Sequence, residues 1–309
     1  MDKVSIIIPV YNRLDYLREA LRSARDQSYE NVEIIVVDDG SEIDIRSVVE
    51  DFPGKGIAYY RQNNRGLSSA RNRGIGLCRG KYVVFLDDDD LLEKNMVAEC
   101  LNKITDNVGV VYSRHEYFGA PGDKAKPEIN HHDRPGPDMF KWLLGGNRIV
   151  VNSVMVKKEW LETVGGFDEK LKSNEDWDLW LRISHRGCGF GYVAKILAQV
   201  RIHENKMQSY RLTMAESGLE VIKKAETYAD KNILDEVGLQ RIKAYHYLLV
   251  GKAWVELGQR KKAREALDKS IEYNVNILNL CYWLGSGFIP TAIFKLAGWS
   301  YRKYMGRIY

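Results

Sequence analysis

The 309-residue sequence lacks the patterns that mark several classes of protein. Its four cysteines, Cys78, Cys100, Cys188 and Cys281, show neither CxxC nor zinc-finger spacing, so we expect reduced thiols rather than disulfides or a structural zinc site. No recognition-helix, zinc-finger or aromatic RNA-binding pattern is present, and a formal net charge of +4 is too small to favour nucleic acid as a partner.

The first residues also lack the features of a secretory signal, because they contain no basic segment, no long apolar segment and no small-residue cleavage site. We therefore expect the protein in the cytoplasm. The first apolar run leads into Pro9-Val10-Tyr11-Asn12, which is not a glycine-rich loop that carries Lys or Arg. This absence argues against a nucleotidyltransferase, and the absence of GxGxxG argues against a dinucleotide-dependent dehydrogenase.

Short apolar runs alternate with amphipathic stretches over residues 1–110. The runs span residues 4–10, 32–37, 57–60, 82–86 and 108–112. Three stretches between them carry apolar residues at helical spacing, from Leu14 to Ala24, from Ile45 to Phe52 and from Leu67 to Leu77. Apolar strands that alternate with helices predict an α/β fold with a mainly parallel sheet, in which ligands lie at the carboxyl ends of the strands.

The second half of the chain changes from mixed structure to helix. Residues 119–137 are rich in Gly, Pro, Asp and His and predict a long loop. Strands near 149–156 and 192–202 and helices from Lys158 and over 176–185 follow. Beyond residue 212, the stretches 241–257 and 261–271 predict a helix pair that resembles one tetratricopeptide unit; a single copy cannot form a solenoid, so a plain helical hairpin is the alternative.

Residues 276–309 form a basic segment that contains no Asp or Glu. Its apolar part, residues 277–299, is interrupted by Gly and Pro near the centre. We expect this amphipathic tail to lie on an anionic membrane surface, which would place the protein at the inner face of the cell membrane. A packed C-terminal helix and a membrane-spanning helix are the alternatives.

Acidic side chains follow two of the expected strands. Four adjacent carboxylates, Asp87 to Asp90, end the fourth run and repel one another, which a divalent cation would offset while bridging to phosphates. A solvated acidic turn is the alternative. Asp38 and Asp39 end the second run, where they either form a turn or accept a hydrogen bond from a nucleotide.

Three more positions could carry chemistry. Residues 63–72 open a helix whose free N–H groups would face the site, with Arg71 within reach of a diphosphate. Asp176 lies at the start of a helix, where it is either a cap or a base that deprotonates an acceptor hydroxyl. His203 follows a strand and is either a structural histidine or a metal ligand.

Together these segments resemble the family 2 glycosyltransferases with the GT-A fold, over about residues 3–210. The matching motifs are Val4 to Asn12, Val36 to Ser41, Asn64-Arg65-Gly66 with Ala70 to Gly74, Gly80 to Asp90, and Val164 to Asp168 followed by Glu175-Asp176. The resemblance implies a mixed, mainly parallel GT-A sheet, with a nucleotide-binding half at 1–110 and an acceptor half at 111–210. A helical extension at 211–275 and the tail at 276–309 would follow.

The resemblance also implies roles for individual residues. The nucleotide-sugar would contact Pro9, Tyr11, Asn12, Asp39, Arg71, Asp87 and Asp88. Asp89 and His203 would bind Mn²⁺ or Mg²⁺, Asp176 would be the catalytic base, and Glu175 and Trp177 would lie on the acceptor side. In the DxD motif, Asp87 pairs with Asp89, and the register of Asp88 with Asp90 is the alternative.

The implied activity is inverting transfer of a sugar, with UDP-sugar as the expected donor, to an acceptor hydroxyl. The acceptor would be a saccharide or lipid-linked saccharide of cell-envelope polysaccharide or glycan synthesis. The Gln-x-x-Arg-Trp motif of processive members is absent, which favours the transfer of one sugar at a time. A nucleotidyltransferase and a non-catalytic scaffold that uses the helical extension are the alternative functions.

Overall fold

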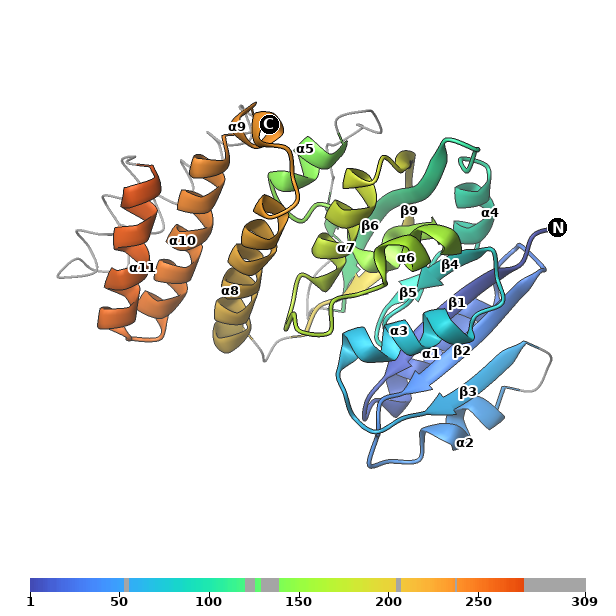
Figure 1. The fold of residues 1–309 in the computed structure, drawn as a ribbon. Coiled ribbons are helices and arrows are strands. Elements are labelled where there is room, and N and C mark those ends of the chain that lie inside the picture. Colours follow the sequence, from blue (N-terminus) through green and yellow to red (C-terminus); the bar gives the residue numbers. More distant parts are fainter. Residues whose placement is uncertain (53–55, 120–125, 129–138, 204–206, 237, 275–309) are drawn as a thin grey trace. The chain divides into compact units, whose positions relative to one another are not determined.

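The computed structural model describes residues 1–52, 56–119, 126–128, 139–203, 207–236 and 238–274 (Figure 1). The chain divides into two compact units, the first made of residues 1–171 and 175–204 and the second of residues 172–174 and 205 onward. The expected boundary at 210/211 falls inside helix α8 (Met207–Glu226), which belongs to the second unit.

The first unit is built on one mixed sheet, which agrees with the predicted GT-A fold. Its amino-terminal strands are β1 (Val4–Val10), β2 (Val32–Asp38), β3 (Ile57–Arg61) and β4 (Tyr82–Phe85). They pair in parallel in the order β3-β2-β1-β4. Residues of β1 and β4 are buried throughout, as expected for parallel strands covered on both faces.

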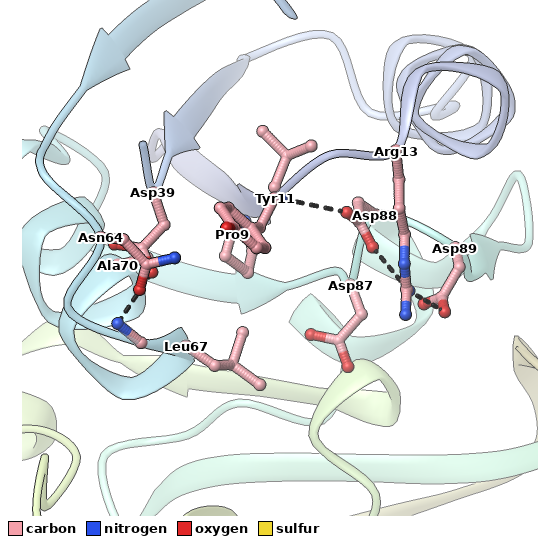
Figure 2. Close-up of a pocket in the computed structure, with 12 residues that line it drawn as sticks. Pro9, Tyr11, Arg13, Asp39, Asn64, Leu67, Ala70, Asp87, Asp88 and Asp89 are labelled. Carbon is pink, nitrogen blue, oxygen red and sulfur yellow. Dashed lines mark hydrogen bonds and ion pairs between the residues drawn. The ribbon is translucent and has the colours of Figure 1, made fainter. Parts of the chain in front are cut away.

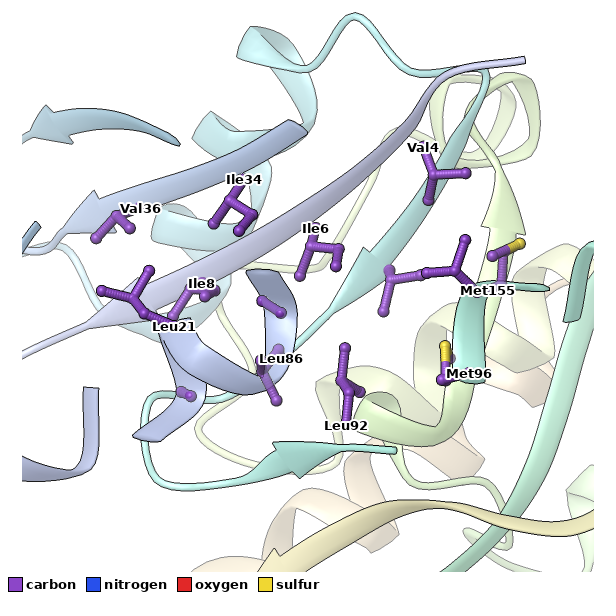
Figure 3. Close-up of a cluster of buried hydrophobic side chains, with 14 of the residues drawn as sticks. Val4, Ile6, Ile8, Leu21, Ile34, Val36, Leu86, Leu92, Met96 and Met155 are labelled. Carbon is purple, nitrogen blue, oxygen red and sulfur yellow. The ribbon is translucent and has the colours of Figure 1, made fainter. Parts of the chain in front are cut away.

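Helices α1 (Leu14–Arg25), α2 (Ile45–Glu50) and α3 (Leu67–Leu77) connect these four strands. The buried face of α1 consists of Leu17, Ala20, Leu21 and Ala24, as its apolar spacing predicts. All four belong to the main hydrophobic core, in which Figure 3 shows Leu21 near Ile8 of β1 and Val36 of β2. Burial of this core fixes the strands, and therefore fixes the loops at their carboxyl ends.

The remaining strands extend the sheet beyond β4 in the order β8-β6-β9-β5, with β7 paired to β6. They are β5 (Leu91–Leu92), β6 (Val108–Phe118), β7 (Lys126–Glu128), β8 (Val154–Lys157) and β9 (Gly189–Arg201). β8 is antiparallel to β4 and β6, whereas β6 and β9 are parallel. The helices of this half are α4 (Met96–Leu101), α5 (Met139–Leu144), α6 (Lys158–Val164) and α7 (Glu175–His185).

Several elements differ from the predicted ones. The strand expected at 149–156 begins only at Val154, because residues 151–153 form a short 3-10 turn. β6 continues past Tyr112 to Phe118, and β5, α4 and α5 lie where no element was predicted. β7 falls within the expected loop 119–137, and residues 120–125 and 129–138 lie outside the described part.

The described part of the second unit contains α8, α9 (Lys231–Glu236), α10 (Leu239–Glu256) and α11 (Arg260–Tyr273). α10 and α11 are the predicted helix pair, and Gly258 between them has a φ of +71°. Ala215, Val250 and Ala266 share a small core that joins α8 to this pair. None of the helices in the described ranges combines the length and apolar character needed to cross a membrane. The tail at 276–309 lies outside these ranges.

Candidate active site

The carboxyl ends of β1, β2 and β4 border one cavity of about 420 Å³ in the first unit (Figure 2). Its walls are formed by Pro9, Val10, Tyr11, Arg13, Asp39, Asn64, Gly66, Leu67, Ala70, Asp87, Asp88 and Asp89. Parallel strands end at the same edge of a sheet, so segments far apart in sequence meet there. The residues Pro9, Tyr11, Asp39, Asp87, Asp88 and Asp89, predicted to contact the nucleotide-sugar or the metal, are thereby brought together.

Asp39 is held at one side of the cavity by donors from the next loop. Its Oδ1 accepts from the backbone N–H of Arg65 at 3.0 Å and from Nε2 of Gln62 at 2.8 Å, and its Oδ2 accepts from the N–H of Gly66 at 2.8 Å. Gly40 has a φ of +80°, and a Cβ there would lie 2.7 Å from the backbone nitrogen of Asn64. Glycine at this position therefore lets the loop approach Asp39.

The acidic run forms the opposite side of the cavity, and its first two carboxylates face different cations. Asp87 accepts at 2.6 Å from Nη2 of Arg71, and Asp88 accepts at 3.1 Å from Nη1 of Arg13. The backbone N–H of Tyr11 also donates to Asp88. Burial, together with the charges of Asp89 and Asp87, raises the pKa of Asp88 to about 7, although Arg13 opposes this shift.

Asp89 lies beside the predicted second metal ligand. Its Oδ2 is 2.7 Å from Nε2 of His203 and also contacts Nη1 of Arg13. Among the described residues, no three His, Cys, Asp or Glu side chains form a complete metal cage. Mg²⁺ at phosphate sites is usually bound by one or two carboxylates, with the remaining ligands from phosphates and water. Asp89 and His203 therefore fit the protein part of such a shell.

The last carboxylate of the run points away from the cavity, which bears on the register of the DxD motif. Asp90 is 3% exposed and does not line the cavity. Its Oδ1 accepts from the backbone N–H of Arg201 at 2.7 Å, and its Oδ2 contacts Nδ2 of Asn152. Because Asp90 is bound by structural partners, the geometry favours Asp87 with Asp89 over Asp88 with Asp90.

Arg71 is buried among protein partners and does not line the cavity. The side chain is 1% exposed, and it donates at 2.6 Å to both Asp87 and Glu175. Its guanidinium also lies over the ring of Phe167, 5.2 Å from the centroid. Through these contacts Arg71 holds an acid of the predicted DxD motif and the residue before the predicted base in fixed positions. Its predicted contact with the nucleotide-sugar stays a prediction.

Asp176 lies in the first turn of α7, directly after Glu175, which Arg71 joins to Asp87. Its Oδ1 accepts from Nδ2 of Asn147 at 2.9 Å and from the backbone N–H of Trp177 at 2.7 Å. Burial and the charge of Glu175 raise the pKa of Asp176 to about 7. A carboxylate with this pKa is suited to accept a proton near neutral pH.

Two predicted site residues have structural partners instead. Asn12 has a φ of 58°, and its Oδ1 accepts from the N–H of Glu42 while its own N–H donates to Ser41, so it joins the loops after β1 and β2. Trp177 is 1% exposed and its Nε1 donates to the carbonyl of Leu143 at 2.7 Å. This burial argues against the expected acceptor contact, because the indole packs in the core.

No pattern in the sequence pointed to Arg13, Asn147 or Asn152 as site residues. Arg13 was detectable only as a cation next to the Tyr11-Asn12 motif. Asn152 donates to the acidic run, and its Oδ1 accepts from the N–H of Asp87 at 2.8 Å. Both asparagines act from segments about 30 and 65 residues away from their partners, for which no local pattern exists.

Comparison with other proteins identifies the family of this chain. The model of "Glycosyl transferase family 2" matches residues 5–165. An uncharacterized glycosyltransferase of Rickettsia typhi is 33% identical over 226 residues, which cover 69% of this chain and 68% of the relative.

Solved structures share the fold at low sequence identity. The structure of S. aureus TarS 1–349 in complex with UDP-GlcNAc has a TM-score of 0.67 and 19% identity, covering 97% of this chain and 92% of that one. The mannosyltransferase PcManGT from Pyrobaculum calidifontis, in complex with GDP-Man and Mn²⁺, has a TM-score of 0.63 and 19% identity, covering 93% and 79%. The chain thus belongs to glycosyl transferase family 2 and is a glycosyltransferase with the GT-A fold.

Proposed function

We propose that the protein transfers a sugar from a nucleotide-sugar, with a UDP-sugar as the favoured donor, to an acceptor hydroxyl with inversion at the anomeric carbon. The observation that carries this proposal is one cavity that is lined on one side by Asp39, a carboxylate that could bind the nucleobase, and on the other side by the acidic run. The TarS structure with UDP-GlcNAc and the PcManGT structure with GDP-Man and Mn²⁺ support such a donor. Family membership favours this reaction over nucleotidyl transfer and over a non-catalytic scaffold.

The donor would occupy the cavity with its base between Tyr11 and Asp39 and its diphosphate toward Asp87 and Asp89. Tyr11 is 44% exposed, so its ring is available for contact with a base. Mn²⁺ or Mg²⁺ bound at Asp89 and His203 would supply positive charge to the leaving diphosphate. Asp87 is kept in place for this role by Arg71 and Asn152.

Asp176 would remove the proton from the acceptor hydroxyl on the face of the sugar opposite the diphosphate. A single displacement then inverts the anomeric configuration. Asn147 and the N–H of Trp177 orient the carboxylate toward this task, and Glu175 would lie on the acceptor side. The acceptor is proposed to be a saccharide or lipid-linked saccharide used in cell-envelope polysaccharide or glycan synthesis.

The test of donor class is a thermal-shift panel of UDP-, GDP-, ADP- and CDP-sugars, each with Mn²⁺ and with a chelator. A UDP-sugar should raise the midpoint of thermal unfolding more than the other nucleotide-sugars do, and this rise should occur with Mn²⁺ but not with the chelator. Asp89→Ala should weaken nucleotide binding in Mn²⁺ but leave the residual binding in chelator unchanged. An equal loss of affinity under both conditions would remove Asp89 from the metal site.

The test of the base is Asp176→Asn. This variant should bind the donor with wild-type affinity and lose turnover, whereas Asp106→Asn, an exposed acid, should keep both. Near-normal turnover of Asp176→Asn would exclude Asp176 as the base. The stereochemistry of the product, read by NMR, decides inversion.

The C-terminal region is proposed to bring the enzyme to its acceptor. We assign residues 211–275 to a helical extension and residues 276–309 to a basic tail that binds the anionic inner face of the cell membrane. Removing residues 276–309 should abolish co-sedimentation with phosphatidylglycerol vesicles. If the shortened protein sediments equally well, the membrane role of the tail is excluded.

A further inference from the structure

Arg13 stands where a cation would bind the acidic run. Its Nη1 contacts Oδ1 of Asp88 at 3.1 Å and also contacts Oδ2 of Asp89. Figure 2 shows the guanidinium lying between the two carboxylates. The Oδ2 atom of Asp89 that meets Arg13 is the same atom that lies 2.7 Å from Nε2 of His203.

A metal ion at Asp89 and His203 would compete with this guanidinium for one carboxylate oxygen. Like charges at about 4 Å repel strongly even near a protein surface, and the repulsion doubles when one of them is divalent. Arg13 therefore cannot keep its present contact while Asp89 coordinates a metal. The Arg13 side chain has room to move into the cavity, because it is 34% exposed and lines the cavity.

We propose that Arg13 is an internal counter-ion that occupies the metal position until a nucleoside diphosphate enters, and that it then moves to the diphosphate. This inference rests on the proposed function, since it requires that the cavity accept a nucleoside diphosphate with a metal. The diphosphate would give the displaced guanidinium a new anionic partner in the same cavity. Metal and nucleotide would then each favour the binding of the other, beyond the coupling that comes from direct coordination of phosphate by the metal.

Arg13 should weaken metal binding in the protein without nucleotide. There, a metal must displace Arg13 from Asp89, and the guanidinium loses this carboxylate partner. With nucleotide bound, the diphosphate replaces the lost partner, so displacement of Arg13 no longer weakens metal binding. By linkage, the factor by which the nucleotide strengthens metal binding equals the factor by which metal strengthens nucleotide binding.

The experiment is to measure Mn²⁺ dissociation constants by electron paramagnetic resonance, without nucleotide and with saturating UDP or GDP. Arg13→Gln should bind Mn²⁺ about tenfold more tightly than the wild type without nucleotide, and its coupling factor should fall by about tenfold. Arg18→Gln is the matched control, because Arg18 lies in α1, which Arg13 directly precedes, and pairs with Asp51 on the surface. It should leave both quantities unchanged.

Arg13→Lys provides a second variant should Arg13→Gln fold poorly. Lysine keeps the positive charge but carries it on a strongly hydrated, flexible ammonium group in place of the planar guanidinium. The nucleotide-free Mn²⁺ affinity of Arg13→Lys should therefore lie between those of the wild type and Arg13→Gln. If both Arg13 variants bind Mn²⁺ as the wild type does and keep its coupling factor, the inference is wrong. If the wild type binds neither UDP nor GDP in Mn²⁺, the proposed function fails instead.

Discussion

At the scale of single residues, the four carboxylates of the acidic run are distinguished by their partners. Asp87 meets Arg71, Asp88 and Asp89 meet Arg13, and Asp90 meets the N–H of Arg201. The repulsion that the sequence suggested is therefore offset by cations of the chain itself as well as by any bound metal. The sequence alone could locate the run. The register of the predicted DxD motif within it depends on the partners of Asp90, which are Arg201 in β9 and Asn152 in the 3-10 turn.

The raised pKa of Asp176 predicts an acid limit to activity. Burial and the charge of Glu175 raise the pKa of Asp176 to about 7. Because the base must be ionised to accept a proton, kcat/KM should fall as the pH drops below about 7. The hydrogen bond from Asn147 lowers the same pKa. Asn147→Ala should therefore shift the acid limb of the kcat/KM profile upward by about half a pH unit to one unit.

The control for this shift is Asn95→Ala, since Asn95 is exposed and its side chain caps nothing in α4. Its pH profile should coincide with that of the wild type. An Asn147→Ala profile that keeps its acid limb and loses only amplitude would show that Asn147 does not act through the pKa of Asp176.

Asn152 is expected to support stability as well as the site. Asn152→Ala would leave the N–H of Asp87 and a carboxylate oxygen of Asp90 without their partner, at a cost of about 2 kcal/mol in the free energy of unfolding. Urea unfolding measures this change. The half-buried Asn31, whose side chain donates to the carbonyl of Met1 near the amino terminus, gives a control: Asn31→Ala should stay within about 0.5 kcal/mol of the wild type. A similar small loss for Asn152→Ala would contradict the assigned role.

At the scale of elements, the amino-terminal strands and helices were predictable because each carries its own apolar pattern. β1, β2 and β4 consist mainly of apolar residues, and α1 has a single buried face. β5 has two residues, and α4 and α5 have six each, so none is long enough to show a period. Their positions come from tertiary packing, which a local reading of sequence does not contain.

The contact between α3 and β1 offers a matched test, because α3 also carries Arg71. A Cβ on Gly74 would lie 2.3 Å from Cγ2 of Ile7, whereas a Cβ on Gly76 would meet nothing within 4 Å. Gly74→Ala should lower the free energy of unfolding by about 2 kcal/mol and reduce kcat as Arg71 shifts. Gly76→Ala in the same helix should raise stability by about 0.5–1 kcal/mol. Equal effects of the two substitutions in urea unfolding would refute this packing argument.

At the scale of the whole molecule, the cavity is lined only by residues of the first unit. Damage to the core of the second unit should therefore spare nucleotide binding. Gly251 in α10 is suitable, since a Cβ there would lie 2.7 Å from Cγ of Leu267 in α11. Gly251→Val should lower the thermal midpoint of the helical unit and change the nucleotide dissociation constant by less than about twofold.

Lys252→Ala, on the neighbouring half-buried position of α10, serves as the control and should change neither quantity appreciably. A large loss of nucleotide affinity in Gly251→Val, with the circular dichroism of the sheet intact, would show that the two units are coupled. The sequence had marked the change to helix near residue 212, and α8 begins a few residues earlier, at Met207. The difference arises because the apolar spacing of α8 is weak at its start.

The hydrogen bonds already made by Asp39 limit which nucleobases the cavity can read. A carboxylate has about four lone-pair positions, and three are taken by the donors from Gln62, Arg65 and Gly66. The position that remains can only accept. Uracil and guanine present a ring N–H on their pairing edge, whereas cytosine and adenine present a ring lone pair there, which would face the carboxylate charge without a proton between them. Discrimination against cytidine and adenosine donors would then be set by the Asp39 carboxylate and by the three donors that hold it.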